Sequence, residues 1–112
     1  MKIILIYISI LLTSVFNKSS VRIDDFCQVY GIIYFEKNKN YADALVYLEE
    51  DETRADLLIF KEDNRLFADE EGIWYITDNP TLANYKLYVV KEKGYADFSV
   101  NYIDDRAFVG CQ

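Results

Sequence analysis

The sequence predicts an all-β domain, built from a short tandem repeat that closes into a compact ring or barrel-like toroid. Three observations support this fold class. A unit of thirteen residues recurs along most of the chain, each unit holds a run of β-branched and aromatic residues, and two cysteines stand near the ends of the repeated region. The length of 112 residues allows one domain and no more.

The first twenty residues differ from the repeats and have the layout of a secretory signal peptide. Met1-Lys2 supplies one positive charge, residues 3–13 form an apolar or small-hydroxyl run, and residues 14–20 are mostly small and polar. Signal peptides have an apolar centre of about 7 to 15 residues, whereas a membrane-spanning helix needs roughly 20. We therefore predict a signal peptide at residues 1–20 and a single repeat domain at residues 21–112, exported to the periplasm or the medium. An uncleaved anchor and a buried strand are the alternatives.

The exported part is strongly acidic. The full chain carries a formal charge of −7, and loss of Lys2 and Lys18 with the signal peptide makes it about −9. Such a surface repels phosphate backbones, so nucleic acid is not expected as a partner. The charge would attract cations or basic proteins, although it also serves simply to keep a β-rich protein soluble.

The repeat is regular except at one place. Most units open with Ala-Asp, and the openers lie thirteen residues apart, but the fourth unit is two residues longer. The openers are Val29, Ala42, Ala55, Ala68, Ala83, Ala96 and Val109. We place the insertion at Glu70-Glu71, immediately before the segment Gly72-Ile73-Trp74-Tyr75.

Two columns of the repeat predict strands. The fifth position is always apolar, and the sixth is aromatic in every unit except the last complete one. The fifth-position residues are Ile33, Val46, Ile59, Trp74, Leu87 and Val100; the sixth-position residues are Tyr34, Tyr47, Phe60, Tyr75, Tyr88 and Asn101. This composition favours strands. Successive residues of a strand face opposite sides, so either both faces are covered or a row of tyrosines is exposed.

The segments between the strands are short, polar and mostly acidic. Several begin with Asp, Asn or Glu, which can cap a single helical turn by accepting backbone hydrogen bonds. We therefore expect short helical turns between the strands. Each segment ends in a large side chain, and we predict that most of these pin the turn to the core. They are Tyr41, Arg54, Phe67, Leu82, Tyr95 and Phe108.

The two cysteines, Cys27 and Cys111, predict a disulfide in an oxidising compartment. In a straight stack of six strands the ends would lie more than roughly 20 Å apart. A disulfide needs Cα atoms within about 7 Å, so an intramolecular bridge would require the array to close on itself. Pairing between two chains is the alternative.

The repeat resembles a known family. Its unit A-D-h-x-V-Y-h-x-D-x-x-x-h, where h is apolar or aromatic, and its G-I-W-Y variant are similar over Val29 to Cys111 to family 6150 of the domains of unknown function, which are small exported bacterial proteins. The resemblance implies a ring in which the chain winds around twice, with a seven-crossing torus knot. Asn84, Asn101 and Val109-Gly110 depart from the family's commonest pattern. The family has no established activity.

Candidate ligand-binding residues fall into three groups. One is a column of acids and one amide that would lie at equivalent places on a ring: Asp43, Asp56, Asp69, Asn84 and Asp97. Such a circle can bind Ca²⁺, but a residue repeated in every unit is better explained by a hydrogen bond to the backbone. The acid clusters lack the spacing of a calcium loop.

The second group is a row of tyrosines, which would stack against sugars or a protein: Tyr34, Tyr47, Tyr75 and Tyr88. Cross-strand packing is the alternative. The third is the irregular unit, where Glu70, Glu71 and Trp74 are candidate ligand contacts. For Trp74 the alternative, an indole that fills the core, is favoured. No metal ligand set and no cofactor are predicted.

Catalysis has little support from the sequence. The chain has no histidine, no G-x-S-x-G motif and no glycine-rich phosphate loop. A carboxylate pair can hydrolyse glycosides, but the repeated acids give no reason to choose one pair. The sequence therefore predicts a structural or protein-interaction module, with a cation- or glycan-binding module as the alternative.

Overall fold

The computed structural model describes residues 25–112, so the predicted signal peptide at residues 1–20 lies outside the described residues. The chain alternates short strands with single turns of 3-10 helix, as predicted. The strands are β1 (Gly31–Phe35), β2 (Ala44–Leu48), β3 (Leu57–Lys61), β4 (Ile73–Ile76), β5 (Tyr85–Val90), β6 (Phe98–Tyr102) and β7 (Gly110–Cys111). The 3-10 helices are η1 (Phe26–Gln28), η2 (Lys39–Tyr41), η3 (Glu52–Arg54), η4 (Arg65–Phe67), η5 (Pro80–Leu82), η6 (Lys93–Tyr95) and η7 (Arg106–Phe108).

Side-chain caps define where the 3-10 helices begin. At all of them except η6, the residue before the helix accepts a hydrogen bond from the backbone N–H two residues on. The capping residues are Asp25, Asn38, Asp51, Asn64, Asn79 and Asp105. Short Asp and Asn side chains reach this donor without strain, so the polar segment of each repeat folds into the same turn.

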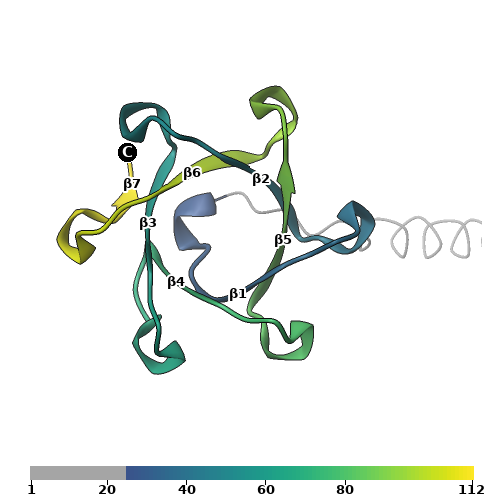
Figure 1. Ribbon diagram of the computed structural model, residues 1–112, viewed down its shortest axis with the longest axis horizontal. Helices are drawn as coiled ribbons and strands as arrows, with labels where there is room; N and C mark the ends of the chain where they lie inside the picture. Colours follow the sequence, from purple (N-terminus) through teal and green to yellow (C-terminus); the bar gives the residue numbers. More distant parts are fainter. Residues whose placement is uncertain (1–24) are drawn as a thin grey trace, which may run out of the picture.

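The order of the strands around the sheet differs from their order in the chain (Figure 1). The hydrogen-bonded order is β4-β1-β5-β2-β6-β3, and β3 also pairs with β4, so the sheet closes into a barrel. All of these pairings are parallel. The chain passes around the barrel with β1, β2 and β3, and then again with β4, β5 and β6, which occupy the positions between the first three. The predicted closure and double winding are confirmed.

The insertion lies where the first circuit of the barrel gives way to the second. The Ile73 N–H donates to the Glu70 carbonyl at 3.1 Å, which makes a turn, and Gly72 in this turn has a φ of +82°. A type II turn requires a positive φ at its third residue, which favours glycine. Elsewhere each connection passes over one strand position, but β3 and β4 are neighbours. The two extra residues therefore lie in the connection between β3 and β4. This connection shifts the second circuit by one position, so that its strands lie between those of the first.

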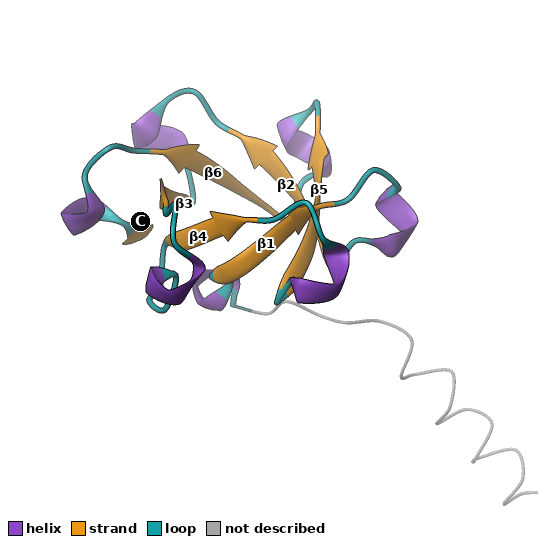
Figure 2. Ribbon diagram, turned by 60° about the horizontal axis from the view of Figure 1, so that its bottom comes forward, coloured by secondary structure: helices purple, strands orange, loops and turns teal. Residues whose placement is uncertain are grey.

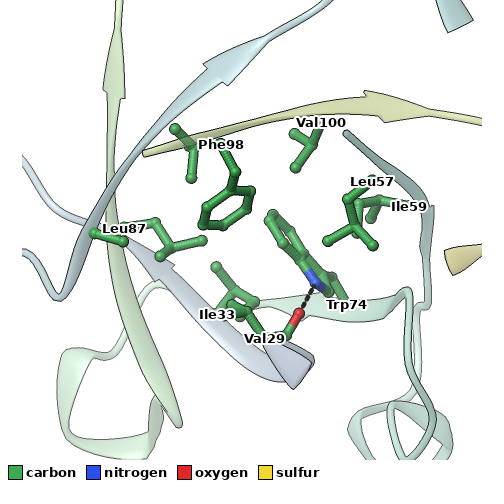
Figure 3. Packing of buried hydrophobic residues seen from close by; sticks show 10 residues of the cluster. Val29, Ile33, Leu57, Ile59, Trp74, Leu87, Phe98 and Val100 are labelled. Atoms are coloured by element: carbon green, nitrogen blue, oxygen red, sulfur yellow. Dashed lines mark hydrogen bonds between the residues drawn. The ribbon is translucent and has the colours of Figure 1, made fainter. Parts of the chain in front are cut away.

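Fifth-position side chains fill the barrel interior (Figure 3). All six are 0% exposed: Ile33, Val46, Ile59, Trp74, Leu87 and Val100. The segment η1 lies inside the ring in Figure 1, where Phe26 stacks on Phe98 with ring centroids 5.3 Å apart. Val29 follows it into the core. The amino-terminal segment of the domain thus completes the core that the six strands enclose.

The connections lie outside the barrel, and this corrects one prediction (Figure 2). The large side chains that end the 3-10 helices were expected to pin the turns to the core. Instead Tyr41, Phe67, Leu82, Tyr95 and Phe108 are 68%, 54%, 46%, 72% and 67% exposed. The strands and the amino-terminal segment already fill the interior of the closed barrel, so the turns that connect the strands have no core to reach.

Candidate functional site

The Ala-Asp column joins the two circuits of the chain. The Asp43 carboxylate accepts the Lys86 N–H at 2.8 Å, while the Asp43 N–H donates to the Lys86 carbonyl at 2.6 Å. Asp97 forms the same pair of bonds with Leu45 at 2.8 and 2.7 Å. The expected backbone role is confirmed for these two residues, but the partner is a strand of the other circuit and not the residue's own turn.

Asn84 and Asp56, two other members of the Asp column, also bond a strand of the other circuit, but with different groups. The Asn84 Oδ1 atom accepts the Ile32 N–H at 2.8 Å. The Asp56 carboxylate accepts both the backbone N–H and the hydroxyl of the buried Ser99. Asp69 differs from these residues, since its carboxylate lies 3.9 Å from the Arg106 guanidinium. The carboxylates of Asp43, Asp56 and Asp97 are therefore occupied by backbone donors, which is a structural role.

The acidic turns are also held by internal bonds. Glu49 pairs with Lys93 at 2.9 Å, and Lys93 further donates to the Arg54 carbonyl. The Lys93 hydrogen bond, and then the Asp51 N–H, lower the pKa of Glu49 below its usual value. Bonds from the hydroxyl and N–H of Thr53 likewise lower the pKa of Asp51. Glu62 and Arg106 form an equivalent ion pair in the next unit of each circuit.

The predicted row of tyrosines is interrupted by the strand register. Because the two circuits alternate, Tyr34 lies beside Lys86, and Tyr88 lies beside Leu45. Tyr47 has Val90 on one side and Ser99 on the other. The ring faces of these half-buried tyrosines therefore do not form one continuous strip for a long ligand.

The residues of the irregular unit lie in different environments. Trp74 is fully buried, and its indole N–H donates to the Val29 carbonyl at 2.7 Å (Figure 3). The prediction of Trp74 as a ligand contact is therefore wrong, because the fifth-position side chain points into the closed barrel. Glu70 is exposed and Glu71 is half-buried, so both carboxylates lie at the surface.

Glu71 belongs to a cluster at the end of the domain, which we call the closure junction and define as Cys27, Glu71, Gly72, Gly110 and Cys111. Cys27 and Cys111 form a disulfide with a Cα–Cα distance of 5.5 Å, which confirms the intramolecular bridge. Glu71 accepts the Cys111 N–H at 3.2 Å. A side chain at Gly72 would meet the Gly110 nitrogen at 2.8 Å, so the inserted turn and the chain end are closely packed.

A hollow of about 490 Å³ opens beside Asn84, the one amide in the Asp column. Its lining combines aromatic and amide side chains with two buried small residues: Gln28, Tyr30, Gly31, Ala68, Asn84 and Tyr85. The Asn84 oxygen is taken by Ile32, which leaves its NH₂ group for a ligand. The sequence flagged Asn84 as irregular, but gave no sign that Gln28, Tyr30 and Tyr85 would join it.

Together these features define a class of protein: an all-β barrel that is wound twice by the chain and bridged by a disulfide. The model of the family described as "7(1) septoil knot domain" matches residues 26–112. The chain belongs to this family. A search of the curated proteins and a search of the solved structures each found no match. Within residues 25–112, no helix is long and apolar enough to cross a membrane.

Proposed function

We propose that the protein is an exported structural or protein-interaction module of the bacterial envelope or medium, without catalytic activity and without nucleic-acid partners. The disulfide supports export, because such bridges persist in oxidising compartments. The finer assignment to family 6150 of the domains of unknown function is part of the same proposal. Export is tested by expressing the full chain in a bacterial host and weighing the product. Loss of residues 1–20 and recovery outside the cytoplasm are expected, whereas an uncleaved cytoplasmic chain would contradict export.

One observation carries the interaction role. Five of the six connecting turns at η2 to η7 end in an exposed apolar side chain, which we call the tip residues: Tyr41, Phe67, Leu82, Tyr95 and Phe108. Leu66 beside Phe67 is 74% exposed. Single exposed apolar residues are ordinary, but the same position exposed around a ring offers a partner several equivalent contacts. Tyrosine and phenylalanine are enriched in the cores of protein interfaces.

The test is chemical cross-linking of the exported protein to native envelope and medium fractions, followed by mass spectrometry. The tip variant carries Tyr41→Ser, Tyr95→Ser and Phe108→Ser. The matched control carries three exposed turn substitutions, Glu50→Ser, Asp63→Ser and Asp104→Ser. Each exposed substitution should change the free energy of unfolding by no more than about 0.5 kcal/mol, so both triple variants should stay within about 1.5 kcal/mol of wild type. We expect specific cross-linked proteins with wild type and control, and their loss with the tip variant. Equal cross-linking by all three, or none by wild type, would contradict the proposal.

A glycan-binding role is the second candidate, and the hollow beside Asn84 favours it. Tyrosine rings stack on sugar faces, and amides bond sugar hydroxyls. A cation-binding role is less favoured, since acids of the turns, such as Asp51, and of the Asp column, such as Asp43, already accept backbone donors.

Asn84→Asp tests this candidate cleanly. It keeps an oxygen for the Ile32 N–H, but removes the NH₂ donor and adds a charge. We expect wild type to bind a neutral oligosaccharide from a soluble panel in NMR titrations, and Asn84→Asp to lose that binding while staying folded. Tyr85→Ala should lose it as well. Equal binding by Asn84→Asp, or no shifts for any sugar, would remove the hollow as a glycan site.

A further inference from the structure

We propose that reduction of the Cys27–Cys111 disulfide converts the closure junction into a zinc site, formed by the two thiolates and the Glu71 carboxylate. This inference goes beyond the proposed function and does not depend on it. The site is latent in the oxidised protein, because both sulfurs are then bonded to each other. It uses Glu71 of the inserted pair, a residue for which the other repeats have no equivalent.

The ligand atoms are already gathered. One ligand atom each from Cys27, Glu71 and Cys111 can be chosen so that all three lie within 4.8 Å of one another. A zinc ion binds thiolate sulfur at about 2.3 Å and carboxylate oxygen at about 2.0 to 2.2 Å, so tetrahedral ligands stand roughly 3.5 to 4 Å apart. Once the sulfur–sulfur bond is broken, small side-chain rotations suffice to reach this spacing.

The carboxyl-terminal cysteine is held in place without the disulfide. Cys111 pairs with Leu57 of β3, and Gln112 beyond it donates its backbone N–H to the Asp56 carbonyl at 3.0 Å. The Gln112 side chain donates to the carbonyls of Glu52 and Ala55 at 2.6 and 2.7 Å. These bonds anchor the chain end on both sides of the sulfur.

Cys27 is anchored by the core. It lies in η1 between Phe26, which stacks on Phe98, and Val29, whose carbonyl binds the Trp74 indole. The Cys27 N–H itself donates to the capping Asp25 at 3.0 Å. Reduction therefore leaves two thiols held close together, and preorganisation of this kind lowers the entropic cost of binding a metal.

Glu71 completes the ligand set. The inserted turn positions it, and one of its oxygens accepts the Cys111 N–H at 3.2 Å. A carboxylate has about four acceptor positions, so this bond orients the group while leaving others for a metal. Two thiolates and one carboxylate carry three negative charges for one divalent ion. Soft sulfur ligands select zinc over calcium or magnesium, and a three-ligand site leaves a fourth position open.

The chemistry balances with a dithiol as the reductant. It transfers two electrons and two protons, the Cys27–Cys111 bond breaks, two thiols form, and the dithiol becomes a disulfide. A zinc ion then displaces one proton from each thiol as it binds. In the reverse direction a small-molecule disulfide accepts two electrons from the two thiolates and becomes a dithiol, while the Cys27–Cys111 bond re-forms and the zinc ion is released. In either state the two ends of the domain are joined, by sulfur or by metal.

The test uses the exported protein reduced with a phosphine and titrated with Co²⁺, a spectroscopic substitute for zinc. We expect one equivalent of Co²⁺ to produce thiolate-to-metal charge-transfer absorption, which zinc then abolishes, and no such band from the oxidised protein. Glu71→Gln should weaken the affinity by at least about tenfold. Glu70→Gln is the matched control, because this neighbour lies outside the cluster, and it should bind as wild type does.

Several results would overturn the proposal. They are no charge-transfer band in the reduced wild type, a band that survives Cys27→Ser unchanged, or equal affinities for Glu71→Gln and Glu70→Gln. Near-ultraviolet circular dichroism of the reduced protein, recorded before metal is added, tests whether the core stays packed without the disulfide. Loss of the fixed environment of Trp74 on reduction would show that the thiols are not held in place, and would also refute a preformed site.

Discussion

The bonds between the two circuits of the chain give the sharpest prediction. Asp97→Ala removes the acceptor of the Leu45 N–H, which lies 2.8 Å from the Asp97 carboxylate. Hydrogen bonds to charged groups contribute roughly 1.5 to 3 kcal/mol, and water partly replaces a lost acceptor at an exposed residue such as Asp97. We therefore expect Asp97→Ala to lower the free energy of unfolding by about 1 to 2 kcal/mol. Asp43→Ala, which loses the Lys86 N–H, should cost a similar amount.

Two further variants separate this bond from general effects of the position. Asp97→Asn should cost less than about 0.5 kcal/mol, since Asn84 makes the same bond with its amide oxygen at 2.8 Å. Asp69→Ala should also be nearly neutral, because the Asp69 carboxylate lies 3.9 Å from Arg106 and belongs to an exposed residue.

The assay is equilibrium urea unfolding with the disulfide intact, approached from the folded and the unfolded side. Unchanged stability of both Asp97→Ala and Asp43→Ala would refute the reasoning. A loss at Asp69→Ala as large as that at Asp97→Ala would refute it equally, since the effect would then not follow the bonds between the circuits.

The remaining predictions concern the core, the inserted turn and one ion pair. Trp74→Phe should lower the free energy of unfolding by about 2 to 4 kcal/mol, because it leaves a buried carbonyl unsatisfied and a cavity beside it; urea unfolding within 0.5 kcal/mol of wild type would contradict this. Gly72→Ala should make the disulfide react faster with dithiothreitol, since the new Cβ would clash with the chain end, whereas Gly94→Ala, with open space around it, should react as wild type does. The hydrogen bond from Lys93 holds the folded-state pKa of Glu49 below the ordinary value of a glutamate carboxyl. The stability from this pair is therefore present above that ordinary pKa and is lost as the pH falls through the folded-state pKa. The difference in thermal midpoint between wild type and Glu49→Gln should therefore narrow on acidification, and a constant difference from pH 7 to about pH 3 would contradict this.

Much of the fold could be predicted because the repeat shows which positions are apolar and which can cap a turn. The fifth position of every unit is apolar and is fully buried in all six strands. The polar segments contain cap residues, and these caps form in the structure. The cysteine argument also held, since Cys27 and Cys111 meet only if the array closes.

The repeat alone could not predict the order of the strands in the sheet. A period of thirteen residues describes neighbours in sequence, whereas the hydrogen-bonded partners of β1 come from β4 and β5, in the second circuit. Double winding was expected only from family resemblance. The inserted pair at Glu70-Glu71 was the visible sign of the change between circuits, but the sequence suggested a ligand contact there.

The candidate site was predicted less well for the same reason. Trp74 was selected as a residue of an irregular unit, yet its place in the fifth column already assigned it to the interior. The tip residues were expected to be buried because they are apolar, and a filled barrel leaves them outside. The hollow beside Asn84 depends on Gln28, Tyr30 and Tyr85, which come together only through the three-dimensional fold.

The central claim is that the strands of two circuits alternate around one barrel, and backbone NMR tests it most directly. Interstrand nuclear Overhauser effects should link β1 with β5 through the pair Tyr34 and Lys86, and β2 with β5 through the pair Leu45 and Tyr88. No such contacts should link β1 with β2, because β5 lies between them. Contacts of β1 with β2, and of β2 with β3, would show a single sequential circuit and would contradict the account.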